Sequence, residues 1–506
     1  MGGLAQMPKS NVENSFFGKA FGGAVWLLSG GITRVIIKTV VLAILARILT
    51  PADFGVLGAC MTLFAFTEVF MQLGVAPALV QKENLSEQDI HTGLLITVSL
   101  SVLFAGGVFW LSPDLASFFS FPDLQAPFQV VALTFPLIAL GTVSGALLQR
   151  NLKFKLIAMI EVSSYAFGYG LVSVSLALAQ WGFWALIVGQ VAQFVLRNFL
   201  LFVASKHSLS FHFDVDSARS LLNFGVGATL ARIFNYFAAN GDYLVVGRTL
   251  GVDYLGLYTR AYFLIQQPAN LIGQIVNNVL FPILSVIKSD IERVIRIYQG
   301  GVFLVFLSSG LGSVLLFFSA KEIVLLLLGE QWTSLVLPFQ ILLIGLPFRI
   351  AYKIGNTVIK ASGAVYMLAL WQFCYAVLII AGAFYGARYG LNGVAAFVTG
   401  AMILGYFLNI TFVKLVFPLP LLSEALILIK VFVLASALSI FLYSLSCVIW
   451  FEQLPLVFRL AMNAIVTLLF IGVTFPFLRN IFGVSASWIL DRGVGTFRAK
   501  FLKSRS

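Results

Sequence analysis

About fourteen stretches of apolar residues, each long enough to cross a lipid bilayer, run through this chain of 506 residues. A membrane-spanning helix needs roughly 20 consecutive apolar residues, and polar or Gly/Pro-rich breaks separate stretches of about that length. Since the bilayer interior offers no water to the backbone N–H and C=O groups, each stretch must satisfy them internally, as a helix does. The sequence therefore predicts an all-α polytopic membrane protein.

The placement of charge supports this class. Hydrophobic residues make up 60% of the chain and charged residues 10%, and the mean hydropathy is +0.99, outside the range of ordinary soluble domains. With the predicted loops assigned alternately to the two sides, nineteen lysines and arginines fall on one side and five on the other. The richer side is expected to be cytoplasmic, so both termini are predicted there. The net charge of +12 follows from this asymmetry and indicates membrane lipids, not nucleic acid, as partners.

A motif near the start of the chain occurs a second time. The segment ARILTPADFGVL (Ala46 to Leu57) aligns with GRTLGVDYLGLY (Gly247 to Tyr258), which sets Gly55 opposite Gly256. Many transporter folds are duplications, so we predict two pseudo-repeated six-helix lobes followed by two further helices. The predicted domains are residues 1–205 (helices 1–6), 206–415 (helices 7–12), 416–480 (helices 13 and 14) and 481–506 (a basic cytoplasmic tail).

The helix count, the two lobes and the segment ARILTPADFGVL resemble a known family over residues 15 to 480. It comprises the polysaccharide flippases (Wzx-like, colanic-acid-exporter type) of the multidrug/oligosaccharidyl-lipid/polysaccharide exporter superfamily. The resemblance implies a V-shaped pair of lobes around a cavity, in the bacterial inner (plasma) membrane. It also implies alternating access that exports a polyprenyl-diphosphate-linked oligosaccharide, a repeat unit of exopolysaccharide, capsule or lipopolysaccharide O-antigen, with a polysaccharide polymerase complex as a candidate partner. The alternatives are a small-molecule or multidrug cation antiporter of the same superfamily and a peptidoglycan-precursor flippase.

Two cations, Arg34 and Lys38, lie one helical turn apart inside the first apolar stretch. On a helix they share one face, about 40° apart. Charges inside a bilayer are costly and face the protein interior or a hydrated cavity, and two like charges this close favour an anion between them. We therefore expect them to bind the diphosphate. The alternative is that one of them pairs with Glu68 while the other reaches the membrane surface.

A second cationic stripe lies in the tenth predicted helix, FRIAYKIGNTVIK. Arg349, Lys353, Asn356 and Lys360 fall on one narrow face of a helical wheel. We predict that Arg349 and Lys353 join the diphosphate site, together with Arg260 of the eighth helix. The alternative is that these side chains reach the headgroups or form a salt bridge.

The eighth predicted helix carries a stripe of amides within about one third of its circumference. Amides both donate and accept hydrogen bonds, so this face can bind sugar hydroxyls without burying net charge; hydrogen bonding between helices is the alternative. The residues predicted to contact saccharide are Gln266, Gln267, Asn270, Gln274 and Asn277.

Carboxylates are few in the predicted helices. A carboxylate inside a membrane can exchange a proton or hold Na⁺, so Glu68 and Asp242 are candidates for coupling transport to a proton or Na⁺ gradient. The alternative is that each carboxylate only neutralises a nearby cation. Glu68 would then neutralise Arg34, and Asp242 would neutralise Arg232. Glu161 lies near the cytoplasmic end of its helix and is expected to be structural.

No catalytic site is predicted. The patterns GxSxG, HExxH and Walker A do not occur in the sequence, although each would be needed for a known class of chemistry. The three histidines and three cysteines lack the spacing of metal ligands. We therefore expect a transporter without a cofactor or a metal, and no enzyme.

Overall fold

The structure, a computed structural model, describes residues 33–481 except 209, 211, 276–279, 282–283, 285–286, 288–289, 449–450 and 452. Helices are its regular elements, and no strand occurs in that part of the chain. A first helix covers residues 33–48. The others are α2 (Pro51–Gln72), α3 (Val75–Gln81), α4 (Glu87–Phe118), η1 (Pro122–Leu124), α5 (Gln125–Ala132), α6 (Phe135–Arg150), α7 (Phe154–Ser163), η2 (Ser164–Leu171), α8 (Val172–Leu178), α9 (Phe183–Ser205), α10 (Val215–Thr249), α11 (Val252–Ile275), α13 (Ile291–Phe318), α14 (Ala320–Leu327), η4 (Glu330–Leu335), α15 (Val336–Ala361), α16 (Val365–Ala387), α17 (Gly390–Val416), α18 (Leu421–Ser446) and α20 (Leu456–Ile481).

Within the described residues, ten helices are long and apolar enough to cross a membrane. The bent pair Pro122–Ala132 and Phe135–Arg150, which meet at 43°, would make an eleventh span. The chain is thus an all-helical, multi-pass membrane protein, as predicted, whereas the count of about fourteen spans stays a prediction. The long helices α10 and α11 are not among the ten, because charged and amide side chains interrupt their apolar surface.

Capping residues determine where several helices begin. Thr50 Oγ1 accepts from Asp53 N (3.3 Å) and Asp53 Oδ2 accepts from Thr50 N (2.8 Å), which closes a capping box at the start of α2. Ser86 and Asp89 do the same for α4. Asp214 caps α10 by accepting from Ser217 N at 2.7 Å, and this hydrogen bond lowers the pKa of Asp214 below its ordinary value.

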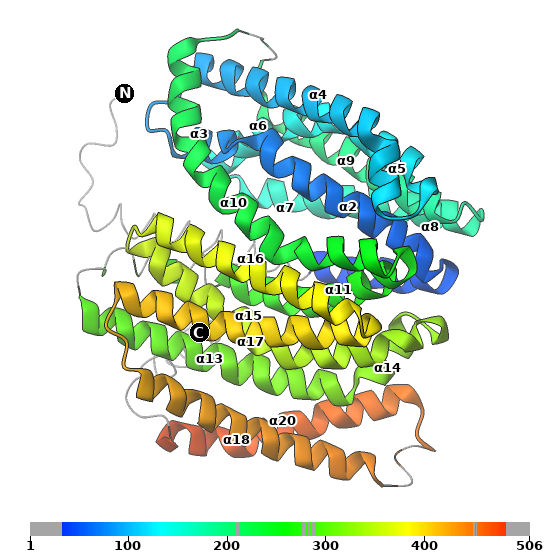
Figure 1. Ribbon diagram of the computed structural model, residues 1–506, viewed down its shortest axis with the longest axis vertical. Helices are drawn as coiled ribbons and strands as arrows, with labels where there is room; N and C mark the ends of the chain where they lie inside the picture. Colours follow the sequence, from blue (N-terminus) through cyan, green and yellow to red (C-terminus); the bar gives the residue numbers. More distant parts are fainter. Residues whose placement is uncertain are drawn as a thin grey trace, which may run out of the picture. The chain divides into compact units, whose positions relative to one another are not determined.

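The chain packs as two compact units, Met1–Thr259 and Arg260–Ser506. In the first unit, α9 packs on α6 and η2, and α10 packs on α2 and α4 (Figure 1). One core joins α3, α4, α6 and α10 through buried aliphatic side chains, among them Val75, Leu94, Val143 and Leu221. Because α10 belongs to this packing unit, the predicted lobe boundary at residue 205 is not the boundary between units. The repeat boundaries stay a prediction, since packing units do not define repeats.

In the second unit, α17 packs on α15 and α16, and α13 packs on α15 and α18 (Figure 1). The last two helices, α18 and α20, both contact α13. Leu311 of α13 meets Leu438 and Leu442 of α18 in a buried cluster, which Val466 and Phe470 of α20 cover in part. The helices that lie outside the predicted repeats are therefore bound to this unit through a core of their own.

The two copies of the repeated motif contact each other within the first unit. A Cβ added at Gly55 would overlap the carbonyl oxygen of Val252, and a Cβ added at Gly256 would overlap that of Pro51. Both glycines lie in the first turns of a helix, α2 and α11 respectively. The contact is reciprocal, so each copy needs glycine at the same position to let the other backbone approach.

Candidate functional site

An ion-pair network joins three helices of the first unit. Arg34 Nη1, in the helix over residues 33–48, donates to Glu161 Oε2 of α7. Arg197 Nη2 of α9 lies 3.6 Å from the other oxygen of the same carboxylate. The three side chains are 34%, 29% and 35% exposed. Arg34 therefore pairs with Glu161 and not with Glu68, and Glu161 lies between two arginines.

The second cation of the first helix lies against an aromatic pair. Lys38 Nζ is 5.3 Å from the ring centroid of Tyr165, and the Tyr165 and Tyr169 centroids are 5.1 Å apart. Both tyrosines belong to η2, a π-helical segment, and such segments occur often at functional sites. At Gly168 a Cβ would lie 2.6 Å from Gln193 Cα, so glycine allows η2 to approach α9 closely.

Glu68 extends the network to α10. Gln72 Nε2 donates to Glu68 Oε1 (2.8 Å), and Arg232 Nη1 donates to Gln72 Oε1 (3.2 Å). Arg197 and Arg232 also lie close enough to Glu68 for an electrostatic interaction. We call the six charged residues the first-unit charge cluster: Arg34, Lys38, Glu68, Glu161, Arg197 and Arg232. Arg34, Arg197 and Arg232 interact with its two carboxylates, and Lys38 lies against Tyr165. With four cations and two carboxylates, the cluster carries an excess of positive charge.

A polar cavity of about 270 Å³ opens at one end of this cluster, between α2 and α10. Tyr236 in its wall is buried, and its hydroxyl donates to Thr62 O at 2.8 Å. The lining residues are Glu68, Val69, Gln72, Arg232, Asn235, Tyr236, Ala239 and Asn240.

Asp242, which the sequence offered as a partner for Arg232, lies elsewhere on α10. Its side chain is 1% exposed and accepts from Tyr258 Oη at 3.0 Å and from Tyr243 N at 3.1 Å. Arg232 instead bonds Gln72. Asp242 and Glu68 are therefore held by different partners and do not form one acidic pair.

In the second unit, the cations of α15 meet α11. The Arg349 guanidinium lies 4.7 Å from the Tyr262 ring centroid, and Lys353 Nζ donates to Ala269 O at 3.2 Å. Arg349 is 8% exposed. The stripe thus faces protein groups. A cation that lies over the face of an aromatic ring is stabilised by the ring electrons.

The remaining members of that stripe also have partners. Asn356 Oδ1 accepts from Asn409 Nδ2 at 3.1 Å, and Lys360 Nζ lies 4.9 Å from the Phe281 ring. The predicted stripe on α15 is therefore present as a continuous face that is bonded to neighbouring helices.

The amide stripe of α11 is described in part. Gln267 Nε2 donates to Phe263 O of its own helix at 3.4 Å, the Arg260 guanidinium lies 5.8 Å from the Phe263 ring, and Gln266 is half-buried. Asn270 is exposed. The side chain of Gln274 and all of Asn277 lie outside the described residues.

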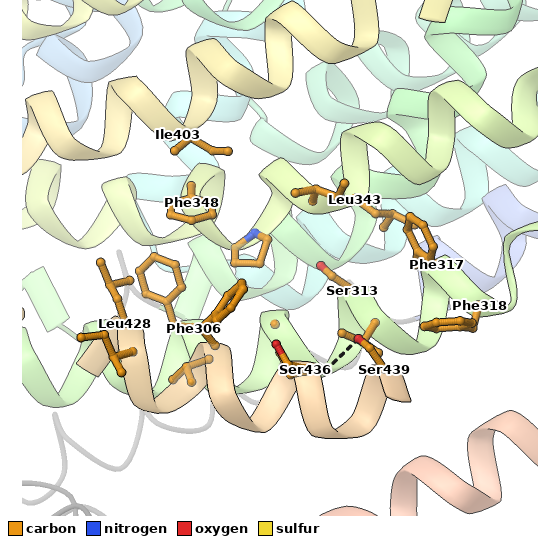
Figure 2. A pocket seen from close by; sticks show the side chains of 18 of the residues that line it. Phe306, Ser313, Phe317, Phe318, Leu343, Phe348, Ile403, Leu428, Ser436 and Ser439 are labelled. Atoms are coloured by element: carbon orange, nitrogen blue, oxygen red, sulfur yellow. Dashed lines mark hydrogen bonds between the residues drawn. The ribbon is translucent and has the colours of Figure 1, made fainter. Parts of the chain in front are cut away.

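The second unit also holds an apolar cavity of about 770 Å³ between α13, α15, α17 and α18. Figure 2 shows Phe306, Phe348 and Leu428 around it, with Ser439 bonded to the backbone of its own helix at 2.8 Å. No charged residue lines it, so it does not fit a phosphate group. Among the described residues, no group of three or more His, Cys, Asp or Glu could hold a metal ion.

The sequence analysis did not identify Arg197, although a signal was present. Gln190, Gln193 and Arg197 follow one another at helical spacing along α9 and would mark a polar stripe on an apolar helix. The structure links this arginine to Arg34 through Glu161 and brings it within electrostatic reach of Glu68. Arg349 and Lys353 share a second face with α11.

Comparison with known proteins gives the family and the fold of this chain. A family described as "Polysaccharide biosynthesis protein" matches residues 44–337. The chain is 28% identical to Lipopolysaccharide biosynthesis protein WzxC of Escherichia coli (strain K12), over 67% of this chain and 69% of that protein. It is 26% identical to Succinoglycan biosynthesis transport protein ExoT of Rhizobium meliloti (strain 1021), over 58% of this chain and 60% of that protein.

A solved structure titled "Lipid II flippase MurJ, inward closed conformation" has the same fold. It aligns with a TM-score of 0.72 at 14% identity, over 91% of this chain and 100% of that one. The family match covers more than half of the sequence. The chain belongs to the polysaccharide biosynthesis protein family.

Proposed function

We propose that this protein is a flippase that exports a polyprenyl-diphosphate-linked oligosaccharide by alternating access. The first-unit charge cluster is the observation that carries the proposal. Arg34 and Arg197 lie in apolar helices, and in the part of the chain that the structure describes the four cations of the cluster outnumber Glu161 and Glu68. A diphosphate supplies the missing negative charge and accepts several hydrogen bonds from arginine at once.

In this proposal Arg34, Lys38 and Arg197 hold the diphosphate on the first unit. Arg349 and Lys353, with Arg260, supply positive charge from the second unit. The lipid tail stays in the bilayer. The amides of α11, Gln266, Gln267, Asn270, Gln274 and Asn277, contact the saccharide.

The membrane potential assists the step. A negative charge that moves outward from a negative cytoplasm gains about 2.3 kcal/mol per 100 mV. The cluster therefore has to bind the headgroup in one leaflet and release it in the other. Glu68 and Asp242 balance charge or carry a coupling proton or Na⁺.

The charge of the cluster also separates this proposal from the alternatives. A cavity for cationic drugs would need an excess of carboxylates, whereas cations outnumber carboxylates here. A peptidoglycan precursor carries the same diphosphate, but membership in a polysaccharide biosynthesis family favours the oligosaccharide. We place the protein in the bacterial inner membrane with cytoplasmic termini, next to a polysaccharide polymerase complex.

The test is deletion of the gene in its host. We expect polyprenyl-diphosphate oligosaccharide to accumulate on the cytoplasmic leaflet, and the wild-type gene to abolish the accumulation. Arg34→Ala and Arg197→Ala should restore export at least about ten-fold less well, because each removes a charge-assisted bond.

Arg388→Ala is the matched control. Arg388 is an exposed cation near an aromatic ring, 5.5 Å from the Tyr385 centroid, and does not belong to the cluster. This variant should restore export fully. Full export by both Arg34→Ala and Arg197→Ala would contradict the proposal.

A further inference from the structure

The polar cavity between α2 and α10 differs in chemistry from the rest of the charge cluster. Its two charged lining residues, Glu68 and Arg232, have opposite signs, and its other polar groups are two asparagines, one glutamine and one tyrosine. The lining thus carries no net charge. A space of about 270 Å³ with both donors and acceptors suits a neutral molecule rich in hydroxyl groups.

Several polar atoms in the cavity wall are already fixed by the protein. Gln72 links Glu68 to Arg232, and Asn240 Nδ2 donates to Tyr236 O at 3.3 Å. Tyr236 packs against Phe66 with ring centroids 5.5 Å apart, which makes this side of the wall rigid. Asn235, with an exposed side chain, presents its amide to the cavity. The wall is preorganised, which reduces the entropy lost on binding.

Glu68 connects the cavity electrostatically to the arginines of the cluster. Glu68 lines the cavity and also interacts with Arg197, and Arg197 in turn shares Glu161 with Arg34. A ligand whose anionic group lies at Arg34 and Arg197 therefore places the adjoining group at the cavity. In a glycan joined to a lipid through a diphosphate, that adjoining group is the first sugar.

We propose that the cavity between α2 and α10 is a subsite for the sugar attached directly to the diphosphate, with Asn235 and Asn240 as its specificity-determining residues. This inference rests on the proposed function and refines it. The arginines bind the diphosphate, which all such lipid-linked glycans share. The asparagines recognise the first sugar, which differs between them. Amides in a preorganised wall discriminate between cargoes, because a cargo that lacks the matching hydroxyl forms fewer hydrogen bonds with them.

The test compares two lipids on the purified full chain in lipid nanodiscs. One is bare polyprenyl diphosphate, and the other carries a single neutral hexose on the diphosphate. We expect the wild type to bind the hexose-bearing lipid about ten-fold more tightly, since two added hydrogen bonds correspond to about this factor. Asn235→Ala with Asn240→Ala should remove the preference and leave the affinity for bare lipid within about two-fold.

Two further variants complete the comparison. Asn235→Ala alone has little risk of misfolding, since the side chain is exposed, and it should reduce the preference by about three-fold. Gln129→Ala removes an amide of α5 that bonds Ser112 at 3.0 Å outside the cavity, and it should keep the full preference.

Each outcome decides the inference. A wild type that binds both lipids equally, or a double variant that keeps the preference, overturns the sugar subsite while leaving the proposed function intact. A wild type that binds neither lipid overturns the proposed function and this inference with it. Loss of the preference in the double variant and its partial reduction in Asn235→Ala, with the full preference kept in Gln129→Ala, support it.

Discussion

Glu161 controls how much positive charge the first unit offers to a ligand. Its two oxygens engage Arg34 and Arg197, which come from different helices. Each of these side chains is about one third exposed, so the two guanidinium groups are accessible to a ligand. The carboxylate is therefore better understood as a competitor of the ligand for the two guanidinium groups than as a support of the fold.

This competition predicts the effect of Glu161→Gln. The variant should fold normally and bind bare polyprenyl diphosphate about ten-fold more tightly, because both arginines become available. Arg197→Ala should weaken the same binding by a similar factor. Titration of the purified protein with labelled lipid measures both, and Glu83→Gln, on the surface, serves as the control. Weaker binding by Glu161→Gln would mean that the carboxylate positions the arginines instead of masking them.

At the scale of elements, hydrophobic runs predicted most of the helices. The apolar runs of α4, α13 and α18 are each longer than the roughly 20 residues that a span needs. These helices can therefore be predicted from the sequence without knowledge of their tertiary packing. The capping box at Thr50 and Asp53 marks the start of α2 in the sequence itself. The π-helical form of η2 has no such signal, because it depends on how Gly168 approaches α9.

The partners of the charges could not be predicted in the same way. Arg34 and Glu161 are 127 residues apart, and choosing Glu161 over Glu68 requires the packing of three helices. Periodicity gives the face on which a charge lies, and it correctly grouped Arg349 with Lys353. It does not give the neighbouring helix that this face meets.

The reciprocal glycine contact between α2 and α11 leads to a prediction about element packing. Gly55→Ala or Gly256→Ala should lower the melting temperature of the purified protein, because the new methyl group overlaps a backbone carbonyl that cannot rotate away. Overpacking of this kind costs about 1–3 kcal/mol. Gly106→Ala in α4 is the control: nothing lies within 4 Å of its added Cβ, so the substitution should be neutral or slightly stabilising. Equal melting of Gly55→Ala and wild type would contradict the close approach.

At the scale of the whole molecule, the same contact appears once in each unit. Asn198 of α9 lies against Gly141 of α6, and Asn409 of α17 lies against Gly355 of α15. Both asparagines are 1% exposed, and the carbonyl oxygen of each is buried without a conventional hydrogen-bond partner. A shift of 211 residues sets Asn198 opposite Asn409, but it sets Gly141 opposite Tyr352 and not opposite Gly355. The two contacts are of one kind, whereas the duplication stays a prediction, because the packing units do not coincide with the predicted repeats.

The glycine in each pair explains how the buried oxygen is tolerated. With no Cβ in the way, the asparagine oxygen can lie on the glycine backbone, where a Cα–H···O contact replaces part of the missing hydrogen bond. Gly141→Ala and Gly355→Ala would each insert a methyl group where that oxygen lies. Each should therefore lower the free energy of unfolding by about 1–3 kcal/mol.

The two substitutions test whether each unit uses the pair independently. Gly141 and Gly355 belong to different units and share no partner, so their effects on the free energy of unfolding should add within about 0.5 kcal/mol in the double variant. Thermal or denaturant unfolding in detergent measures all three variants, with Gly400→Ala as control because open space surrounds its added Cβ. If Gly141→Ala is strongly destabilising and Gly355→Ala is neutral, the contact stabilises one unit only. That result would contradict the prediction that the glycine–asparagine pair has the same role in both units.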